Sequence, residues 1–336
     1  MTETDPADAI AQIEAAGADL ARAREQIAKR IVGQRTVVDL ALTAVLSGGH
    51  ALLVGVPGLA KTRLVETLGT VLGLDNARIQ FTPDLMPADI LGSEVLETGA
   101  DGARAFKFIP GPIFTRLLMA DEINRASPRT QSALLQAMQE KEVTVAGQHR
   151  ALDKPFHVLA TQNPLEQEGT YPLPEAQLDR FLLQIDVEYP TRDEERDILL
   201  ATTGADEAQA ERVLDPERLI ALQRLVRSMP VGETVMERIL TIVRSCRPES
   251  DEAAEVARQR LAFGPGPRAA QSLMLAVRAK ALMDGRFAPT LDDVADLAPA
   301  ALSHRMALTF AARAEGATIA SVVEAILAEQ AMEAAA

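Results

Sequence analysis

The chain has 336 residues, of which 47% are hydrophobic and 24% charged, and its 48 acidic and 34 basic side chains give a net charge of −14. This length predicts two domains, or one core with a large appendage. Aromatic residues make up only 3% and tryptophan is absent, so leucine, alanine, valine and isoleucine must fill the core. The acidic balance disfavours a general nucleic-acid surface, which needs clustered lysine and arginine, although it allows a local basic channel.

Targeting, membrane and metal signals are weak. The acidic start, "MTETDPADAIAQIEAAGADL", lacks the basic and apolar segments of a secretory signal, and no apolar run approaches the roughly 18 residues that span a bilayer. We therefore expect a cytoplasmic protein without membrane insertion. The one cysteine, Cys246, excludes an intrachain disulfide. Metal-ligand spacing is lacking among the histidines, which favours structural or surface roles for His50, His149, His157 and His304.

Helical and strand patterns succeed one another along the chain. Helical periodicity covers residues 7–30 and 37–46, with "IVGQ" between them. Short apolar runs then alternate with helical segments, which predicts parallel βαβ units in a doubly wound α/β sheet that is covered on both faces. The five expected strands are residues 50–55, 77–82, 115–121, 156–161 and 181–187.

Two segments interrupt this alternation. Extended runs around "GADG" and around "AGQ" predict β-hairpins inserted in the core, at about 92–112 and 142–155. From residue 215 onward the pattern is helical, with interruptions by Gly and Pro. We expect an N-terminal helix (1–30), an α/β nucleotide-binding core (31–190), a linker (191–214) and an all-helical C-terminal domain (215–333).

The stretch "GVPGLAKT", residues 55–62, follows the first apolar run and opens a helix. Backbone N–H groups of such a turn wrap a β-phosphate, Lys61 can reach the β- and γ-oxygens, and the Thr62 hydroxyl suits Mg²⁺. Ala60 stands where the general phosphate-loop pattern has its second glycine. Alanine is damaging there only if the position needs positive φ, and we expect Ala60 to start the helix, where alanine is favourable.

Polar side chains follow two further expected strands. Asp121 and Glu122 end the third apolar run, and Asn163 follows the fourth. Ligands bind at the carboxyl ends of strands in α/β sheets, so Asp121 is suited to hold Mg²⁺ through its waters, and Glu122 to polarise an attacking water. Asn163 is suited to orient that water. Gln80, at the end of the second run, is a candidate to contact and restrain Glu122.

These residues also have plainer interpretations. Asp121 and Glu122 could cap the next helix, but Ser127 followed by Pro128 is the better N-terminus. Asn163 alone would be a turn residue before proline. Its place at the end of a third strand of the same sheet favours a role in the site.

Five segments, in this order and spacing, carry a resemblance to a known family: "GVPGLAKT", "LLMADEINRASPRTQSALLQAMQE", "TQNP", "EAQLDRF" and "GPGPRA". They resemble the MoxR family of AAA+ ATPases, in the clade with a helix 2 insert and a presensor 1 hairpin. The resemblance runs from about Ile31 to the C-terminal helices. It implies ATP and Mg²⁺ as ligands, a P-loop core followed by a helical lid, and a homo-oligomer, usually a hexameric ring, with nucleotide at subunit interfaces. On this resemblance Ala60 is a family feature.

The resemblance assigns roles by position. Lys61 and Thr62 match the Walker A residues, Asp121 and Glu122 the Walker B pair, with Thr62 and Asp121 at the metal, and Asn163 matches sensor 1. Arg180 resembles the arginine finger, which acts on the neighbouring subunit's γ-phosphate, and Arg268 resembles sensor 2, reaching from the lid to the phosphates. The implied nucleotide contacts are Ile31, Val32 and Gly33 at the adenine, and Gly55, Val56, Pro57, Gly58, Leu59, Ala60, Lys61, Thr62 and Arg63 in the loop.

For the arginines an alternative stays open. Arg180 could be a surface ion-pair residue, and Arg125 or Arg129 could act at the interface instead. The two inserts resemble segments that face the central pore or the substrate.

Three functions are compatible with these residues. The leading one is ATP-driven, chaperone-like remodelling or activation of a protein client, including metal-cofactor insertion, with a von Willebrand factor A domain partner, as the resemblance implies. A nucleic-acid motor is the second, because replicative helicases share the inserts, but "VAGQHRAL" offers few basic and no aromatic residues. A nucleotide-held scaffold is the third, which Glu122, Asn163 and Arg180 disfavour.

Overall fold

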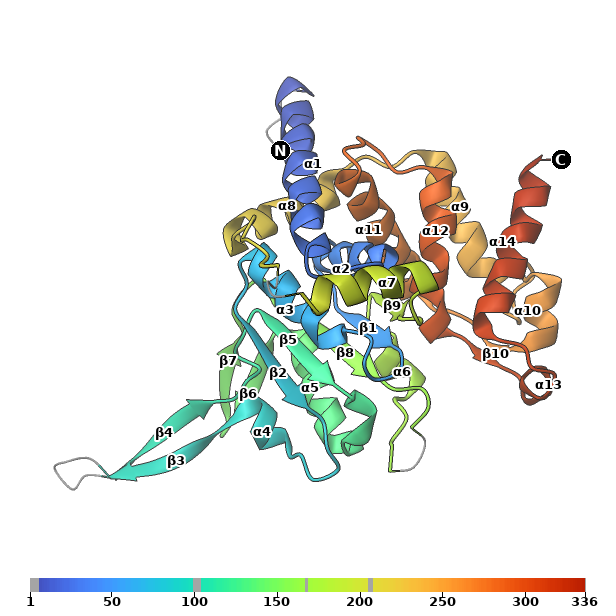
Figure 1. Ribbon diagram of the computed structural model, residues 1–336. Coiled ribbons are helices and arrows are strands. Elements are labelled where there is room, and N and C mark those ends of the chain that lie inside the picture. Colours follow the sequence, from blue (N-terminus) through green and yellow to red (C-terminus); the bar gives the residue numbers. More distant parts are fainter. Residues whose placement is uncertain (1–5, 99–103, 167–168, 205–207, 336) are drawn as a thin grey trace.

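The computed structural model describes residues 6–98, 104–166, 169–204 and 208–335. Its N-terminal half is an α/β sandwich around one central sheet, and its C-terminal third is a group of helices beside that sandwich (Figure 1). The predicted fold class is thereby confirmed. None of the helices within the described ranges has both the length and the apolar character that crossing a membrane would take.

The central sheet has five parallel strands in the order β2-β5-β8-β1-β9. Every residue of β5 is buried, as expected of a parallel sheet with helices on both faces. The five predicted strands are all present, each shifted by at most two residues. Their bounds are β1 (Ala51–Val54), β2 (Asn76–Gln80), β5 (Leu117–Asp121), β8 (His157–Gln162) and β9 (Leu183–Asp186).

Helices of the N-terminal half begin where the local sequence allows. The Ser127 hydroxyl accepts a hydrogen bond from the Thr130 N–H, and Pro128 is the first helical residue of α5, as predicted. The helices are α1 (Pro6–Ala28), α2 (Arg35–Leu46), α3 (Lys61–Leu72), α4 (Pro87–Leu91), α5 (Pro128–Glu140), α6 (Glu175–Leu178) and α7 (Arg192–Thr202), with the 3₁₀ turn η1 (Ile123–Arg125).

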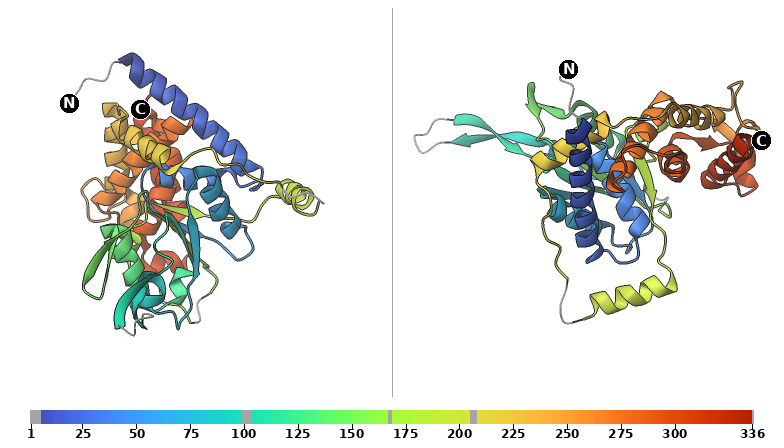
Figure 2. Two further views of the ribbon diagram at one scale, coloured as in Figure 1. Left: turned by 90° about the vertical axis from the view of Figure 1, so that its left-hand side faces the viewer. Right: turned by 90° about the horizontal axis from the view of Figure 1, so that it is seen from above.

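Both predicted hairpins are present. The first pairs β3 (Gly92–Thr98) with β4 (Arg104–Pro110) and projects from the body, and the second pairs β6 (Glu142–Val145) with β7 (Gln148–Ala151) (Figures 1 and 2). The "GADG" turn lies outside the described residues. Arg150 of β7 stacks over the Phe108 ring of β4, 3.8 Å from its centroid, and lies 3.6 Å from Glu94 of β3. The hairpins are therefore joined at their bases by a cation–π contact and an ion pair.

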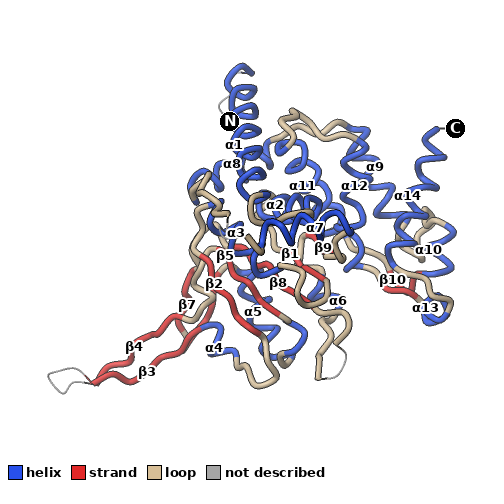
Figure 3. The backbone as a smooth tube through the Cα atoms, viewed as in Figure 1, coloured by secondary structure: helices blue, strands red, loops and turns tan. Residues whose placement is uncertain are grey.

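The C-terminal part is helical, with one addition that the sequence pattern did not predict. Two short antiparallel strands, β10 (Leu261–Phe263) and β11 (Ala307–Leu308), pair within it. Its other elements are α8 (Pro216–Ser228), α9 (Glu233–Ser245), α10 (Glu255–Arg260), α11 (Pro267–Met283), α12 (Leu291–Leu302), the turn η2 (Ser303–Arg305), α13 (Phe310–Ala314) and α14 (Ile319–Ala335) (Figure 3). Helix α7 lies in the predicted linker, stands outside the layers and has no buried residue (Figure 2).

Three of the four histidines are buried structural residues, as predicted. The Val158 N–H donates to Nδ1 of His50 at 2.9 Å, so Nε2 carries the proton and donates to the Met138 carbonyl. His157 donates from Nδ1 to the Gly49 carbonyl at 2.8 Å. Burial lowers the pKa of His50 to about 3 and that of His157 to about 4, because the charged ring would lose its hydration. Burial also lowers the pKa of His304.

We expect the unfolding free energy to be constant above about pH 7 and to fall below pH 6.5. His50, His157 and His304 stay neutral in the folded protein at these pH values, whereas in the unfolded chain they become protonated, which stabilises the unfolded state. The loss approaches about 1.4 kcal/mol per buried histidine for each pH unit below 6.5, down to the folded pKa values. Denaturant unfolding at pH 7.5 and 5.5 measures it.

The matched variants are His157→Asn, which keeps a donor for Gly49, and His149→Gln at an exposed position. The first is expected to reduce the difference in stability between the two pH values by about one third, since it removes one of three groups, and the second to leave it unchanged. An equal pH dependence in all three proteins would contradict the assignment.

Candidate functional site

The loop between β1 and α3 wraps around the Lys61 ammonium group. Lys61 Nζ donates to the carbonyls of Gly55 (2.6 Å) and Val56 (2.7 Å). A Cβ on Gly55 would lie 2.6 Å from the Val187 carbonyl oxygen, so only glycine fits where the loop passes β9. The loop therefore places Lys61 at the carboxyl end of β1 and at the N-terminus of α3, where backbone N–H groups face outward.

Ala60 is the one loop residue whose expected conformation is wrong. It has φ 55° and ψ 19°, a left-handed conformation, and it caps α3, whose first helical residue is Lys61. The position does need positive φ. Alanine is tolerated there at a cost of roughly 1–2 kcal/mol relative to a helical backbone, so the site carries a strained residue where glycine would be relaxed.

Asp121, at the end of β5, is held by partners from both neighbouring strands. The Thr161 hydroxyl of β8 donates to its Oδ1 at 2.6 Å, and Arg78 Nη2 of β2 donates to its Oδ2 at 2.6 Å. The strand register puts Gln80 opposite Asp121 and explains why β2 side chains reach it. Both carboxylate oxygens are therefore oriented, and one is shared with a guanidinium.

Glu122, the residue after β5, takes a left-handed backbone conformation with φ 55°. Gln80 Nε2 and Arg125 Nη1 both donate to its Oε2 at 2.8 Å, and Thr161 accepts its N–H. The expected contact between Gln80 and Glu122 is present. Because both donors use the same oxygen, the carboxylate is held in one orientation.

Electrostatics connects the loop to these carboxylates. Burial lowers the pKa of Lys61, and the charges of Asp121 and Glu122 oppose that shift. Opposite charges act in this way only at short range. The ends of β1 and β5 therefore meet at one polar centre, as the sequence predicted.

Asn163 follows β8 directly and is buried. Its Oδ1 accepts the Leu165 N–H at 3.1 Å, an Asx turn that fits the plainer interpretation of this residue. The turn uses only the oxygen. The amide nitrogen keeps its two donors, so one side chain can hold the turn and still orient a water or a phosphate oxygen.

Residues expected at an adenine ring line two neighbouring cavities. Ile31 and Val32 line a cavity of about 100 Å³ together with Gly58, Leu59 and Ala60 of the loop, and Ile198 and Thr202 of α7 close it. Ile31, Val32 and Gly33 together line the adjoining cavity of about 680 Å³ between α1 and α2. A Cβ on Gly33 would lie 2.8 Å from Glu194 Cβ, so this glycine lets α7 approach.

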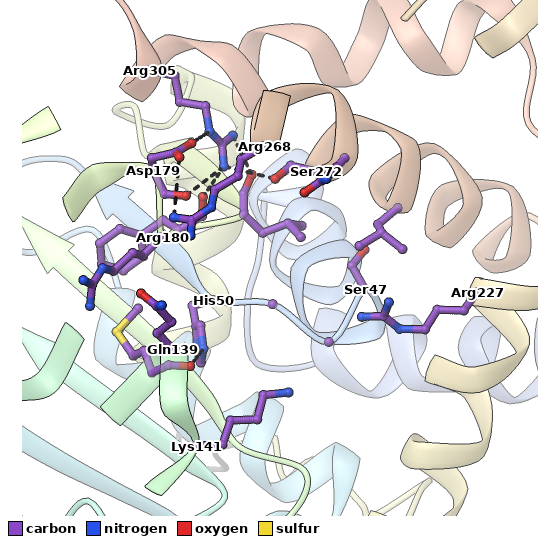
Figure 4. Close-up of a pocket in the computed structure, with 17 residues that line it drawn as sticks. Ser47, His50, Gln139, Lys141, Asp179, Arg180, Arg227, Arg268, Ser272 and Arg305 are labelled. Carbon is purple, nitrogen blue, oxygen red and sulfur yellow. Dashed lines mark hydrogen bonds and ion pairs between the residues drawn. The ribbon is translucent and has the colours of Figure 1, made fainter. Parts of the chain in front are cut away.

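Arg180 and Arg268 lie together, at the other edge of the sheet. Both line a cavity of about 270 Å³ at the amino ends of β1 and β9, beside Gly49 and Leu182 (Figure 4). Gly55 is six positions after Gly49, which at about 3.3 Å per residue puts the two edges roughly 20 Å apart. The expectation that Arg268 reaches from the lid to the phosphates therefore does not hold within one chain.

The cavity that holds these arginines is cationic although the chain as a whole is acidic. Asp179 is the carboxylate among its lining residues, and it lies 3.6 Å from Arg268 and 2.8 Å from Arg305. Arg125, the alternative interface arginine, pairs with Glu122 of its own chain, and Arg129 is exposed on α5. The lining cations are Lys141, Arg180, Arg227, Arg268 and Arg305.

Comparisons with known proteins agree with this architecture. Residues 50–183 match the ATPase family associated with various cellular activities (AAA), and residues 253–326 match the AAA lid domain. The chain is 41% identical over 308 residues to the chaperone MoxR1 of Mycobacterium tuberculosis, covering 92% of this chain and 81% of that protein. It is 31% identical over 305 residues to protein MoxR of Methylorubrum extorquens, with 86% and 87% covered. The chain belongs to the MoxR family of AAA ATPases.

A crystal structure of a Cytophaga hutchinsonii protein has the same fold over nearly the whole length. The TM-score is 0.86 at 34% identity, and the match covers 94% of this chain and 96% of that one. Membership of the MoxR family makes the chain an ATP-hydrolysing enzyme, and its C-terminal helices are the AAA lid.

Sequence reasoning on this MoxR chain missed three polar residues. Arg78 and Thr161 hold Asp121, and Arg305 holds Asp179. Thr161 could have been found, because it stands two residues before Asn163 on a predicted strand. Arg78 and Arg305 lie 43 and 126 residues from their partners and are ordinary arginines in the sequence.

Because Ala60 is strained, we expect glycine at this position to stabilise the protein, although glycine usually destabilises a helix. Ala60→Gly is expected to raise the unfolding free energy by up to about 1 kcal/mol, because the left-handed strain that it relieves exceeds the entropy that glycine adds to the unfolded chain. Ala60→Val is expected to lower both stability and ATP affinity, since a branched side chain fits this conformation poorly. Thermal unfolding and nucleotide titration measure the two effects.

Ala15→Gly is the matched control, because Ala15 is exposed in the middle of α1, where glycine costs about 1 kcal/mol. The same chemical change is thus expected to have opposite signs at the two positions. Destabilisation by both glycines would show that Ala60 is not strained.

Proposed function

We propose that this MoxR protein hydrolyses ATP at the interfaces of a ring in which each site is built from two subunits. One chain supplies Lys61, Asp121 and Glu122, and its neighbour supplies Arg180 and Arg268. The supporting observation is that these two sets occupy opposite edges of the same sheet, roughly 20 Å apart. A triphosphate bound at one edge cannot meet the arginines of its own chain.

The residues at the carboxyl edge fit Mg²⁺ and ATP. Asp121 and Thr62 offer the hard oxygen ligands that Mg²⁺ prefers, and the metal, when bound, would neutralise phosphate charge. Lys61 would exchange the loop carbonyls for the β- and γ-oxygens. Glu122 would accept a proton from the attacking water while the Asn163 amide orients that water. The hydrophobic cavity beside Ile31 and Val32 suits the face of an adenine ring.

The arginines of the neighbour would complete the site. Arg180 would stabilise charge on the γ-phosphate in the transition state, and a finger supplied in this way is worth about 10³ to 10⁵ in turnover. Arg268, whose side chain is 52% exposed, would reach the same phosphates from the lid. A closed ring, with six subunits as the usual family number, gives every subunit such a neighbour.

We also propose that the ring acts on a protein client. The projecting β3–β4 hairpin exposes apolar side chains, of which Phe106 is 72% exposed, and exposed apolar groups suit contact with another protein. One of the similar relatives is named a chaperone. A partner with a von Willebrand factor A domain and a role in metal-cofactor insertion are finer proposals that rest on the family resemblance.

Subunit mixing tests the two-chain site. Rings of Glu122→Gln alone, or of Arg180→Ala alone, are expected to lose at least about 100-fold in ATP turnover. A mixture of the two is expected to regain turnover, because the Arg180→Ala chain keeps its carboxylates and meets an intact arginine on its Glu122→Gln neighbour.

The ATPase rate of mixtures at several ratios, measured with total protein constant, gives the result. Regained turnover should be greatest at intermediate ratios. Wild-type turnover by Arg180→Ala alone, or no gain at any ratio, would contradict the proposed site.

A trapping experiment tests the protein client. Glu122→Gln in ATP should hold its client, so affinity purification from a lysate treated with nuclease is expected to recover a specific protein. Phe106→Ser in the same background is expected to lose most of it, and Phe310→Ser, which removes an 88% exposed ring from the lid, to keep it.

Nucleic acid is the competing occupant. ATP turnover stimulated severalfold by single-stranded or duplex nucleic acid, with binding that weakens steeply as salt increases, would favour the motor over the chaperone.

A further inference from the structure

One buried arginine of the lid is hydrogen-bonded to the segment that carries Arg180. Arg305, in η2, is 4% exposed. It donates from Nε to Asp179 Oδ1 at 2.8 Å and from Nη2 to the Phe181 carbonyl at 2.6 Å. We propose that Arg305 is a positioning residue that fixes the lid to this segment, so that Arg180 and Arg268 reach the neighbouring nucleotide as one unit. The inference rests on the proposed two-chain site.

The guanidinium of Arg305 is saturated by its partners. Besides the two bonds above, Nη1 donates to the carbonyls of Leu182 (3.2 Å) and Ala301, and Nη2 to Ser272 Oγ at 3.0 Å. These acceptors come from the core and from the lid. A planar fork of five N–H groups can satisfy such a set, whereas a lysine has three donors on one atom. The contact therefore specifies arginine and joins the two parts of the chain at one point.

Asp179 connects Arg305 to both functional arginines, Arg180 and Arg268. Its Oδ1 is bound by Arg305, and its Oδ2 faces Arg268 at 3.6 Å, an ion pair that is too long for a hydrogen bond (Figure 4). Arg180 is the next residue in the chain. Fixing the Asp179 carboxylate and backbone therefore sets the start of the Arg180 side chain and the charge beside Arg268 together.

Other groups strengthen the same attachment. His304, adjacent to Arg305, is buried and places Nε2 3.0 Å from the Phe181 carbonyl. Ser272 lies on α11, one turn beyond Arg268, so Arg305 also contacts the helix that carries the second arginine. Misplacing a catalytic group by about 1 Å can cost about 100-fold in rate, which makes such a rigid attachment useful to groups that act across an interface.

Directional subunit mixing separates positioning from a general structural role. In the mixture of Glu122→Gln and Arg180→Ala chains, turnover depends on the arginines of the Glu122→Gln chain and on the nucleotide site of the Arg180→Ala chain. Arg305→Met added to the Glu122→Gln chain is expected to lower the regained turnover by about tenfold or more. The same substitution added to the Arg180→Ala chain is expected to change it less than twofold, because that chain lacks Arg180 and therefore completes no productive site on its neighbour.

Two further variants make the result specific. Asp179→Asn should act in the same direction-dependent way, and Arg305→Lys should keep less than half of the regained turnover. Arg286→Met is the matched control, since Arg286 makes a comparable pair with buried Asp293, and its ion pairs in the described part of the chain are with the lid residues Asp284 and Asp293. It should act equally, or not at all, in the two chains.

Equal losses from Arg305→Met in either chain, whether through folding or assembly, would assign Arg305 a structural role and overturn the inference, as would no loss in either. If the parent mixture regains no turnover, the proposed two-chain site fails, and the inference fails with it. These outcomes differ from one another, because the parent mixture contains no change at Arg305.

Discussion

The direction of the five parallel strands is the constraint on which the site depends. Because all strands run the same way, the two edges of the sheet are chemically different. The carboxyl edge collects Lys61, Asp121 and Glu122, and the amino edge collects Arg180 with the lid arginine Arg268. No rotation of a side chain spans the roughly 20 Å between them. A catalytic site that needs both sets must therefore be closed by a second subunit.

Within the carboxyl edge, charged groups are partnered by the chain itself. Lys61 is bonded to loop carbonyls, Arg78 to Asp121, and Gln80 with Arg125 to Glu122. Phosphate oxygens and Mg²⁺ must compete with these contacts. The exchange of one set of hydrogen bonds for another costs little net free energy, whereas a buried group left without a partner would cost about 1–3 kcal/mol, and a charged group more. The residues can therefore be held in place and remain available to the nucleotide.

The sequence predicted the sheet and the carboxyl edge well, because both depend on local patterns. An apolar run followed by Asp121, or a loop followed by Lys61, is readable within a few residues. The backbone of Ala60 was not readable, since its left-handed turn is set by how the loop closes and not by alanine's own preference. The side of the sheet that Arg268 faces depends on how the lid packs against the core. That packing is fixed by contacts such as Arg305 with Asp179, 126 residues apart, which no local pattern records.

Helix α7 and the lid are attached to the core with different strength. Helix α7 closes the cavity beside the loop of its own chain with Ile198 and Thr202, and the chain then continues into the lid. The lid is fastened to the amino edge, where Arg268 lines the cationic cavity. Since α7 has no buried residue, a movement of this helix breaks little packing. Arg305, in contrast, attaches the lid rigidly to the core segment at Asp179. In the proposed ring, the chain would therefore connect a weakly packed helix near its own nucleotide to a rigid attachment near the nucleotide of its neighbour.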